Sequence, residues 1–338
     1  MSERKEAWEI RDIMSERGGG AVVRRSLKIV LLFLLACVVT VLLIFFGSAF
    51  FFAQRADYAW SPAVSEPTFG KNRPLLLFDE AHHNASTTGF AGRYWPFARL
   101  LRADGYRVVR NRDLFTASRL GGVEMLVIAN ASGAAKPQIF GMNVPLPERG
   151  SRSDPAFTAG EIETIAAWVE KGGSLLLIAD HAPFGEAAAN LSSALGVTMH
   201  KGFVEVPGEV SDPLLFSKED GRLGDHPIVN GDSPSSRVTR VMTFTGQSLS
   251  GPDGATVLLR LPDTAVEAVP EGDSLVSRKA GPAQALAFAK GRGRVVVLGE
   301  AGMATAQVSR RVRFGMNTPG NDNRQFILNT MHWLSHKL

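Results

Sequence analysis

One long apolar stretch near the amino terminus constrains this chain more than any other feature. Residues 29–53 carry no charge, and only Thr40, Gly47 and Ser48 among them are not apolar. A helix over residues 27–54 would be about 40 Å long, which exceeds the roughly 30 Å thickness of the hydrocarbon core of a bilayer. The stretch therefore predicts a membrane-spanning segment at residues 27–54 and excludes a purely soluble protein.

A cleaved signal peptide is the competing interpretation of this stretch. Its apolar part would run for only about 7 to 15 residues and would end at a cleavage site with small side chains. Here the stretch ends in Ser-Ala-Phe-Phe-Phe-Ala-Gln over residues 48–54, which is a poor cleavage site. We therefore expect an uncleaved anchor in the lipid bilayer.

The charges that flank the stretch predict its orientation. Three cations, Arg24, Arg25 and Lys28, lie at its amino-terminal side, whereas Arg55 alone follows it closely. Because positive flanks stay on the cytoplasmic side, the tail of residues 1–26 is predicted to be cytoplasmic. The rest of the chain would then be extracytoplasmic, which means periplasmic in a Gram-negative bacterium.

Composition limits what the remaining chain can be. Of its 338 residues, 45% are hydrophobic and 21% are charged, which is a composition that can build a hydrophobic core. The one cysteine, Cys37, lies in the apolar stretch, so a disulfide framework and a cysteine-based zinc site are excluded. The net charge of +4 comes without a long run of Lys and Arg, which argues against a nucleic-acid partner.

Short apolar runs and helical patterns alternate after a linker at residues 55–74. The capping-box pair Thr158 and Glu161 marks the clearest helix, which the glycine pair at 172–173 ends. The expected strands cover residues 75–78, 106–110, 125–129 and 174–179, and a second helix covers residues 94–103. Strands that alternate with helices at this spacing predict a doubly wound α/β domain with a flavodoxin-like, mostly parallel sheet.

The second half of this domain, which we expect to span residues 75–338, is less regular. Strand-like pieces among proline and glycine turns predict an antiparallel β extension over residues 203–289. The sequence Asp225-His226-Pro227-Ile228 is interpreted as a turn that enters a strand, with His226 as a weaker binding candidate. A hairpin at residues 283–298 and a helix at residues 323–336 complete the expected domain.

Acidic and imidazole side chains follow several of the predicted strands. In an open α/β sheet, ligands bind beyond the carboxyl ends of the strands, where such side chains would meet. The candidate catalytic or ligand-facing residues are Asp79, His82 and His83 after the first strand, Asp180 and His181 after the fourth, and Glu300 after the late hairpin strand.

These residue types suit two kinds of chemistry. They could act as general acids and bases, or they could hold a divalent metal such as Zn, Mn or Fe. The candidate metal ligands are Asp79, His82, His83, Asp180 and His181. Structural roles are also open, because an Asp after a strand can cap a turn or the next helix.

Motifs for nucleotide binding and for a serine nucleophile are missing from the sequence. No Gly-x-Gly-x-x-Gly follows the first predicted strand, and no Walker sequence occurs anywhere in the chain. No Gly-x-Ser-x-Gly surrounds Ser132, which follows the third strand. We therefore expect neither a nucleotide ligand nor a serine nucleophile.

Several short sequences, taken in order, resemble one known superfamily. The helix and strand at residues 165–178 are similar to those before the nucleophile elbow of class I glutamine-amidotransferase-like proteins, and residues 291–298 resemble their late hairpin. The sequence His226-Pro227-Ile228 resembles the trehalose-utilisation-type branch, and residues 77–82 look like uncharacterised bacterial membrane proteins of that superfamily. The resemblance covers about residues 75–338 and implies a pocket at the strand ends.

The departures from that superfamily decide what the resemblance implies about activity. Where amidotransferases have the elbow cysteine, this chain has Ala179-Asp180-His181, and Glu300-Ala301-Gly302 stands where their histidine and glutamate follow the late strand. We therefore expect no glutamine hydrolysis. Two functions remain open. One is a non-catalytic module that binds a carbohydrate or cell-envelope ligand, and the other is a metal-dependent or acid/base hydrolase with a substrate of that kind.

Overall fold

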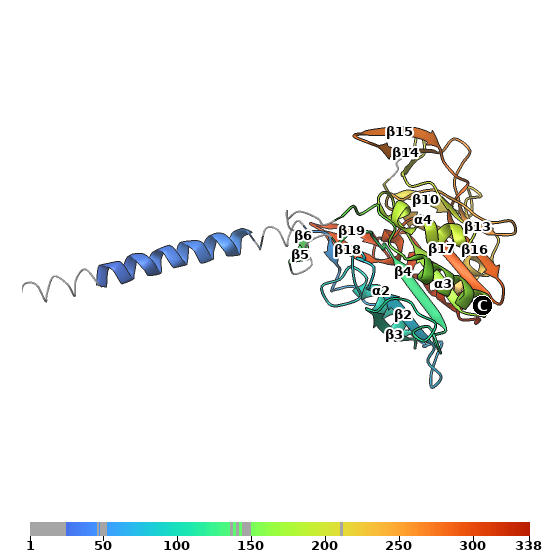
Figure 1. The fold of residues 1–338 in the computed structure, drawn as a ribbon, viewed down its shortest axis with the longest axis horizontal. Coiled ribbons are helices and arrows are strands. Elements are labelled where there is room, and N and C mark those ends of the chain that lie inside the picture. The colour runs from blue at the N-terminus through green and yellow to red at the C-terminus, as the bar shows by residue number, and fades with distance from the viewer. Residues whose placement is uncertain are drawn as a thin grey trace, which may run out of the picture. The chain divides into compact units, whose positions relative to one another are not determined.

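The chain divides into two units in the computed structural model. The first, Met1–Ala53, contains a helix over Arg25–Phe45, and the second is Gln54–Leu338. Residues 25–45, 47, 53–135, 138–139, 142–143, 150–209 and 212–338 are described by the structure. The helix Arg25–Phe45 is long and apolar enough to cross a membrane (Figure 1). Residues 1–24, 46 and 48–52, which belong to the predicted tail and span, lie outside the described residues.

Parallel strands form one half of the central sheet of the second unit. Within the described residues this sheet has nine strands, and five of them run parallel in the spatial order β3-β2-β4-β7-β17. Their bounds are Leu75–Asp79 for β2, Arg107–Asn111 for β3, Met125–Ala129 for β4, Ser174–Ile178 for β7 and Gly293–Leu298 for β17. This is the flavodoxin-like order, in which the order reverses between β2 and β4. The predicted fold class is confirmed.

Antiparallel strands extend the sheet beyond β17. The predicted hairpin is present, and Leu286 of β16 pairs with Val297 of β17. The extension consists of β16 (Ala283–Lys290), β12 (Leu249–Ser250), β8 (Thr198–Met199) and β13 (Thr256–Arg260), which pairs with β16.

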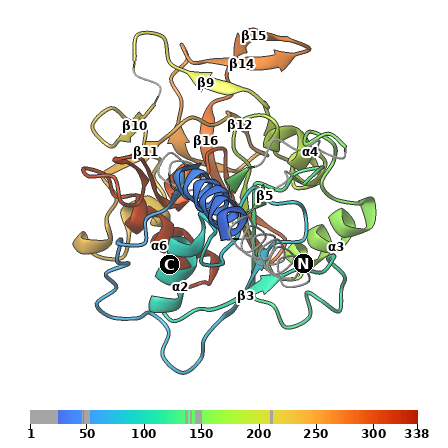
Figure 2. The ribbon, with the colours of Figure 1, turned by 90° about the vertical axis from the view of Figure 1, so that its left-hand side faces the viewer.

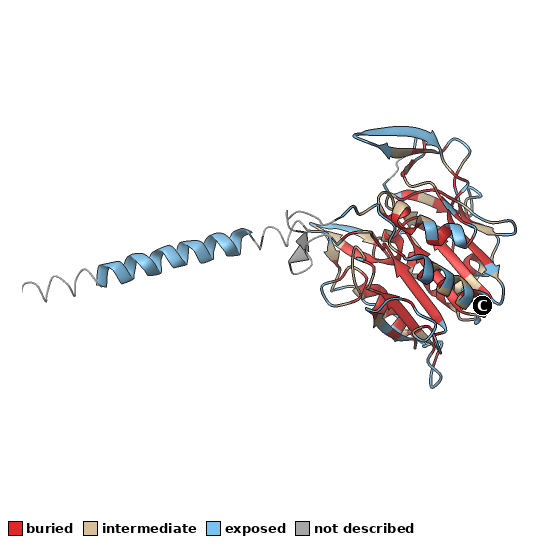
Figure 3. Ribbon diagram, in the orientation of Figure 1, coloured by how far each residue is buried: buried red, intermediate tan, exposed pale blue. Residues whose placement is uncertain are grey.

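Smaller sheets surround the central one. A three-stranded sheet contains β9 (Phe203–Glu205), β14 (Val266–Glu271) and β15 (Ser274–Lys279), and β15 is exposed along its whole length (Figure 3). Two pairs are β10 (Leu214–Ser217) with β11 (Arg240–Thr243), and β5 (Gln138–Ile139) with β6 (Met142–Asn143). A further sheet joins β1 (Arg55–Ala56), β18 (Ala306–Ser309) and β19 (Val312–Gly315), so a strand begins inside the predicted linker.

Helices cover both faces of the central sheet. Helices α2 (Trp95–Ala103) and α6 (Asn323–Leu334) pack on one face, whereas α3 (Ala159–Glu170) and α4 (Phe184–Ala194) pack on the other (Figure 2). Because both faces are covered, the first four residues of β2, 75–78, are all apolar rather than alternating with polar residues. Leu76 and Phe78 point to the first face and Leu77 to the second. Each such buried side chain contributes roughly 1.5 to 3 kcal/mol of transfer free energy.

Local sequence signals set the ends of α3. The side chain of Thr158 accepts a hydrogen bond from the backbone N–H of Glu161. In return, the Glu161 carboxylate accepts a hydrogen bond from the backbone N–H of Thr158. After the helix, Gly172 has a φ of +114°, and a Cβ on Gly173 would lie 2.2 Å from the Trp168 ring. Both glycines are therefore required, and the predicted capping box is confirmed.

The interpretation of residues 225–228 as a turn that enters a strand is wrong. A short helix, α5 (Pro227–Asn230), follows His226, and the imidazole Nδ1 accepts a hydrogen bond from the backbone N–H of Ile228 at 3.2 Å. The ring packs on Trp333, and burial, helped by the charge of Arg294, lowers the pKa of His226 to about 4. His226 thus caps a helix. Two short 3₁₀ turns, η1 (Pro234–Ser236) and η2 (Gly302–Ala304), complete the described elements.

Candidate functional site

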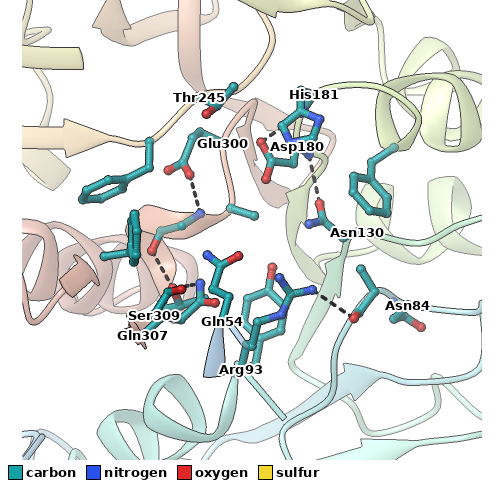
Figure 4. Close-up of a pocket in the computed structure, with 18 of the residues that line it drawn as sticks. Gln54, Asn84, Arg93, Asn130, Asp180, His181, Thr245, Glu300, Gln307 and Ser309 are labelled. Atoms are coloured by element: carbon teal, nitrogen blue, oxygen red, sulfur yellow. Dashed lines mark hydrogen bonds between the residues drawn. The ribbon is translucent and has the colours of Figure 1, made fainter. Parts of the chain in front are cut away.

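A pocket of about 490 Å³ lies at the carboxyl ends of the parallel strands (Figure 4). Strand β2 leads to His83 and Asn84, and β4 leads to Asn130. Strand β7 leads to Asp180, and β17 leads to Glu300. The pocket therefore includes the point where the strand order reverses, which is where open α/β sheets bind ligands.

Asn130 holds the ends of β4 and β7 together. Its backbone takes a φ of 47°, and its Oδ1 accepts a hydrogen bond from the N–H of Asp180 at 2.9 Å. From the other side, Gln247 donates its Nε2–H to the carbonyl oxygens of Ala179 at 2.9 Å and Asp180 at 3.0 Å. The amide side chains of Asn130 and Gln247 thus fix the backbone at residues 179 and 180, from which the Asp180 side chain projects.

Two carboxyl groups, Asp180 and Glu300, project into the same pocket (Figure 4). Glu300 is only 1% exposed, and its two oxygens accept hydrogen bonds from the N–H groups of Gly302 at 2.5 Å and Met303 at 2.7 Å. Burial raises the pKa of Asp180. Burial and then the charge of Asp180 raise the pKa of Glu300 well above its ordinary value. The pair therefore keeps a proton to higher pH than two separate carboxyl groups would.

His181 stands beside this pair with a defined ring orientation. Its Nδ1 lies 2.7 Å from the carbonyl oxygen of Ala182, and its ring stacks on Phe203 with centroids 4.6 Å apart. Because a carbonyl only accepts hydrogen bonds, Nδ1 carries the proton. In the neutral ring, Nε2 is then an acceptor.

Asp79 and His82 lie outside the pocket lining, in a buried cluster. The His82 Nδ1 is 2.9 Å from Oδ1 of Asp79, and its Nε2 is 2.8 Å from Oε1 of Glu161. The imidazole also packs between the rings of Phe115 and Phe157. Burial alone would lower the pKa of His82, but the hydrogen bonds and charges of the two carboxylates outweigh it, and the pKa is raised.

The six candidates are therefore divided between two places. The structure brings His83, Asp180, His181 and Glu300 to the pocket, whereas Asp79 and His82 make a structural clamp with Glu161. Both ring nitrogens of His82 are occupied by carboxylates, which leaves neither for a metal. In the part of the chain that the structure describes, no three His, Cys, Asp or Glu side chains are grouped so as to hold a metal ion.

Sequence reasoning missed several residues that line the pocket. Asn130 directly follows a predicted strand, so the rule that selected Asp180 would have found it. Tyr94 and Arg93 precede α2 with no such signal. Gln54 directly precedes β1, and Gln307 lies in β18 of the same small sheet.

Uncharged polar groups and aromatic rings make up much of the rest of the lining, together with the charged residues Arg93, Arg152 and Asp212. Tyr94 is 2% exposed, and burial raises the pKa of its hydroxyl group. Arg93 donates a hydrogen bond to the carbonyl oxygen of Ala85 at 3.1 Å. The remaining polar and aromatic lining includes Gln54, Asn84, Thr245, Gln307, Ser309, Phe184, Phe244 and Phe314.

Comparisons with known proteins support the fold but assign no function to the chain. No family model and no curated protein matches the chain. Among solved structures, the mmIFT52 N-terminal domain is 15% identical with a TM-score of 0.53, and the match covers 77% of this chain and 97% of that one. A ThuA-like protein from Bacteroides uniformis is 14% identical with a TM-score of 0.44 and coverages of 82% and 95%. A GMP synthase protein from Thermoplasma acidophilum is 11% identical, with a TM-score of 0.38 and coverages of 79% and 96%.

Proposed function

We propose that the unit Gln54–Leu338 binds a small, neutral, hydroxylated ligand of the carbohydrate type in the pocket at the strand ends. The observation that carries the proposal is the lining itself. Amide, hydroxyl, carboxyl, imidazole and guanidinium groups surround a space of about 490 Å³ together with three phenylalanine rings, so the pocket offers both donors and acceptors of hydrogen bonds. A sugar presents vicinal hydroxyl groups to such polar side chains and apolar C–H faces to aromatic rings.

Glutaminase activity is not part of this proposal. In the resemblance to amidotransferases, Ala179-Asp180-His181 takes the place of the elbow cysteine, and the one cysteine of the chain, Cys37, lies in the apolar helix. A carboxylate held by the N–H of His181 at 2.9 Å does not replace a thiolate in acyl transfer.

The proposal includes a place for the domain in the cell. The helix Arg25–Phe45 would anchor the chain in a membrane, with the amino-terminal tail in the cytoplasm and the pocket on the opposite side. The ligand would then be a carbohydrate or another hydroxylated compound of the cell envelope.

Thermal unfolding in the presence of sugars tests the binding proposal. The probes are neutral monosaccharides and disaccharides, including glucose, mannose, N-acetylglucosamine and trehalose. At least one should raise the Tm of the domain, because a ligand that binds the folded state stabilises it. Tyr94→Phe should weaken that ligand about fivefold, since it removes one hydrogen-bonding group from a buried wall of the pocket.

Tyr58→Phe is the matched control, because Tyr58 lies outside the pocket lining. It should bind the same sugar as the unaltered domain does. If Tyr94→Phe and Tyr58→Phe bind that sugar equally well, or if no sugar of the panel raises the Tm, the binding proposal is wrong.

The carboxyl pair favours a second candidate function, an acid/base hydrolase that acts on a carbohydrate. Such an enzyme needs one protonated and one ionised carboxyl group at the same pH. Asp180 and Glu300 line one pocket, and the charge of Asp180 adds to burial in raising the pKa of Glu300 well above its ordinary value, so the pair loses its two protons in separate steps. Between those steps one carboxyl group is protonated and the other is ionised.

Hydrolysis of p-nitrophenyl glycosides distinguishes the two candidates. A hydrolase should release p-nitrophenol, with a fall of at least about a hundredfold in kcat for both Asp180→Asn and Glu300→Gln. A domain that binds a sugar but hydrolyses none of its glycosides is the binding module.

A further inference from the structure

The small sheet β1-β18-β19 attaches the first residues after the apolar segment firmly to the domain. Arg55 pairs with Val308 and Ala56 pairs with Gln307. The next residue, Asp57, donates its N–H to the carbonyl oxygen of Ala306 at 2.8 Å and accepts a hydrogen bond from Asn317 at 2.9 Å. The domain therefore begins, without a flexible spacer, at the second residue of its unit.

Chain length then limits how far this sheet can be from a membrane. The uncharged apolar run ends at residue 53, and β1 begins at Arg55. Two extended residues span at most about 7 Å. If residues 27–54 cross the bilayer, as the proposed anchoring requires, the edge of this sheet lies close to the lipid head groups.

The β18–β19 hairpin presents a basic tip beside β1. The turn and the start of β19 carry three exposed arginines, Arg310, Arg311 and Arg313, around Val312, which is 58% exposed. Residues 306–315 contain no acidic side chain. Cations near a membrane surface are attracted to anionic lipids, and an apolar side chain between them can enter the interface.

The same hairpin also forms part of the pocket. Gln307 and Ser309 of β18 and Phe314 of β19 line it, and Gln307 pairs with Phe314 across the hairpin. A surface that holds the tip of the hairpin would therefore also hold one wall of the pocket.

We infer that the tip of the β18–β19 hairpin, with Arg311, Val312 and Arg313, is a docking surface for the anionic phospholipid head groups of the membrane that anchors the chain. The inference rests on the proposed anchoring and adds a second contact to it. The anchor fixes the chain in the bilayer, and the hairpin turns the rim of the pocket toward the lipid surface. The pocket would then receive ligands from the membrane surface more readily than from solution.

Vesicle sedimentation with the unit Gln54–Leu338 tests this inference without the anchor. This unit contains both hydrophobic clusters of the described residues and so folds on its own. We expect it to bind phosphatidylcholine vesicles that contain phosphatidylglycerol, to bind pure phosphatidylcholine much more weakly, and to be released by high salt.

The double variant Arg311→Ala/Arg313→Ala should weaken binding to the anionic vesicles about 25-fold, since each arginine near such a surface contributes about a fivefold gain. The matched control is Arg278→Ala/Lys279→Ala, which removes two exposed cations from the β14–β15 hairpin instead. The control should bind as the unaltered domain does. Unchanged circular dichroism would show that both variants are folded.

Three results would overturn the docking surface: no preference for anionic vesicles, equal binding by the hairpin variant and the unaltered domain, or equal losses in the hairpin variant and the control. Carbonate extraction of the full chain reports on the anchor separately. A chain that resists extraction, with a domain that ignores vesicles, overturns the docking surface alone. A full chain that carbonate releases overturns the proposed anchoring and the inference together.

Discussion

His82 shows how one buried side chain can stabilise the fold beside the pocket. Its two ring nitrogens contact carboxylates from different parts of the chain, Asp79 at 2.9 Å and Glu161 at 2.8 Å. Breaking a buried pair by removing one partner leaves an uncompensated charge and costs about 3 to 5 kcal/mol. Asp79 has a further partner, because Asn84 donates a hydrogen bond to its Oδ2 at 3.0 Å.

The stabilisation by His82 should depend on pH. Its pKa in the folded protein is raised above the ordinary 6.5, so its contribution is complete below about pH 6.5 and is lost as the pH rises through the folded value. Burial alone would raise the pKa of Glu161, but hydrogen bonds from Phe115, His82 and Thr158 lower it below 4.5. The contribution of Glu161 is therefore present above pH 4.5 and is lost only in stronger acid.

We expect His82→Gln to lower the free energy of unfolding by about 3 kcal/mol between pH 4.5 and 6.5, and by less in mildly alkaline solution. Urea unfolding of both proteins across this range measures the difference. A difference that stays constant, or that grows with pH, would show that His82 is not held as an imidazolium. His200→Gln is a useful control, since that ring contacts Ser250 rather than a carboxylate.

The rule that polar residues at strand ends face a ligand selected six residues but could not sort them. The structure places His83, Asp180, His181 and Glu300 at the pocket. It turns His82 toward Glu161, which lies 79 positions away in the sequence. No local pattern reveals a partner at that distance, so the clamp could not be predicted.

At the scale of elements, structure followed the sequence where the signals were local. Helix α3 begins directly after Thr158, the first residue of its capping box, and ends before its glycine pair, and β16 and β17 form the expected hairpin. The pairing of β1 with β18 had no such signal, because two residues pair with partners about 250 positions later. The pocket residues that this sheet supplies were missed for the same reason.

Removal of the N-cap of α3 should destabilise both the helix and the cluster of Asp79, His82 and Glu161. Thr158→Ala should lower the free energy of unfolding by about 1 to 2 kcal/mol, because the N–H of Glu161 loses its acceptor. The Thr158 hydroxyl also donates to Oε2 of Glu161 at 2.8 Å, so the clamp on His82 loosens as well. Urea unfolding measures the cost. Thr158→Ser keeps both hydrogen bonds and should cost little, and an Ala variant as stable as the Ser variant would contradict this account.

The whole molecule combines a helix long and apolar enough to span a membrane with an α/β unit that has its own core. Strand order and layers followed from the alternation of short apolar runs with helices, since both are set by hydrophobic burial. If the helix spans a membrane, as we propose, the side on which the α/β unit lies depends instead on the charges that flank the helix.

Those flanking charges lead to a prediction about orientation. Alkaline phosphatase fused after Leu338 should be active when the chain is expressed in a Gram-negative bacterium, because the enzyme folds only outside the cytoplasm. Changing Arg24, Arg25 and Lys28 to Glu should reduce that activity severalfold, since the positive flank sets the orientation. An inactive fusion that is present at normal abundance would contradict the predicted orientation.

Glu161 joins three segments that are far apart in the sequence. Its carboxylate accepts hydrogen bonds from the N–H groups of Phe115 at 3.0 Å and Thr158 at 3.2 Å, and it contacts His82. A single side chain thus connects the loop after β2, the segment between β3 and β4, and the start of α3. Local opening of any one segment would break the hydrogen bonds of the other two, so we expect their amide hydrogens to exchange with solvent in one cooperative event. These three segments would then behave as one rigid body beside the pocket. A ligand could therefore bind in the pocket without first ordering them.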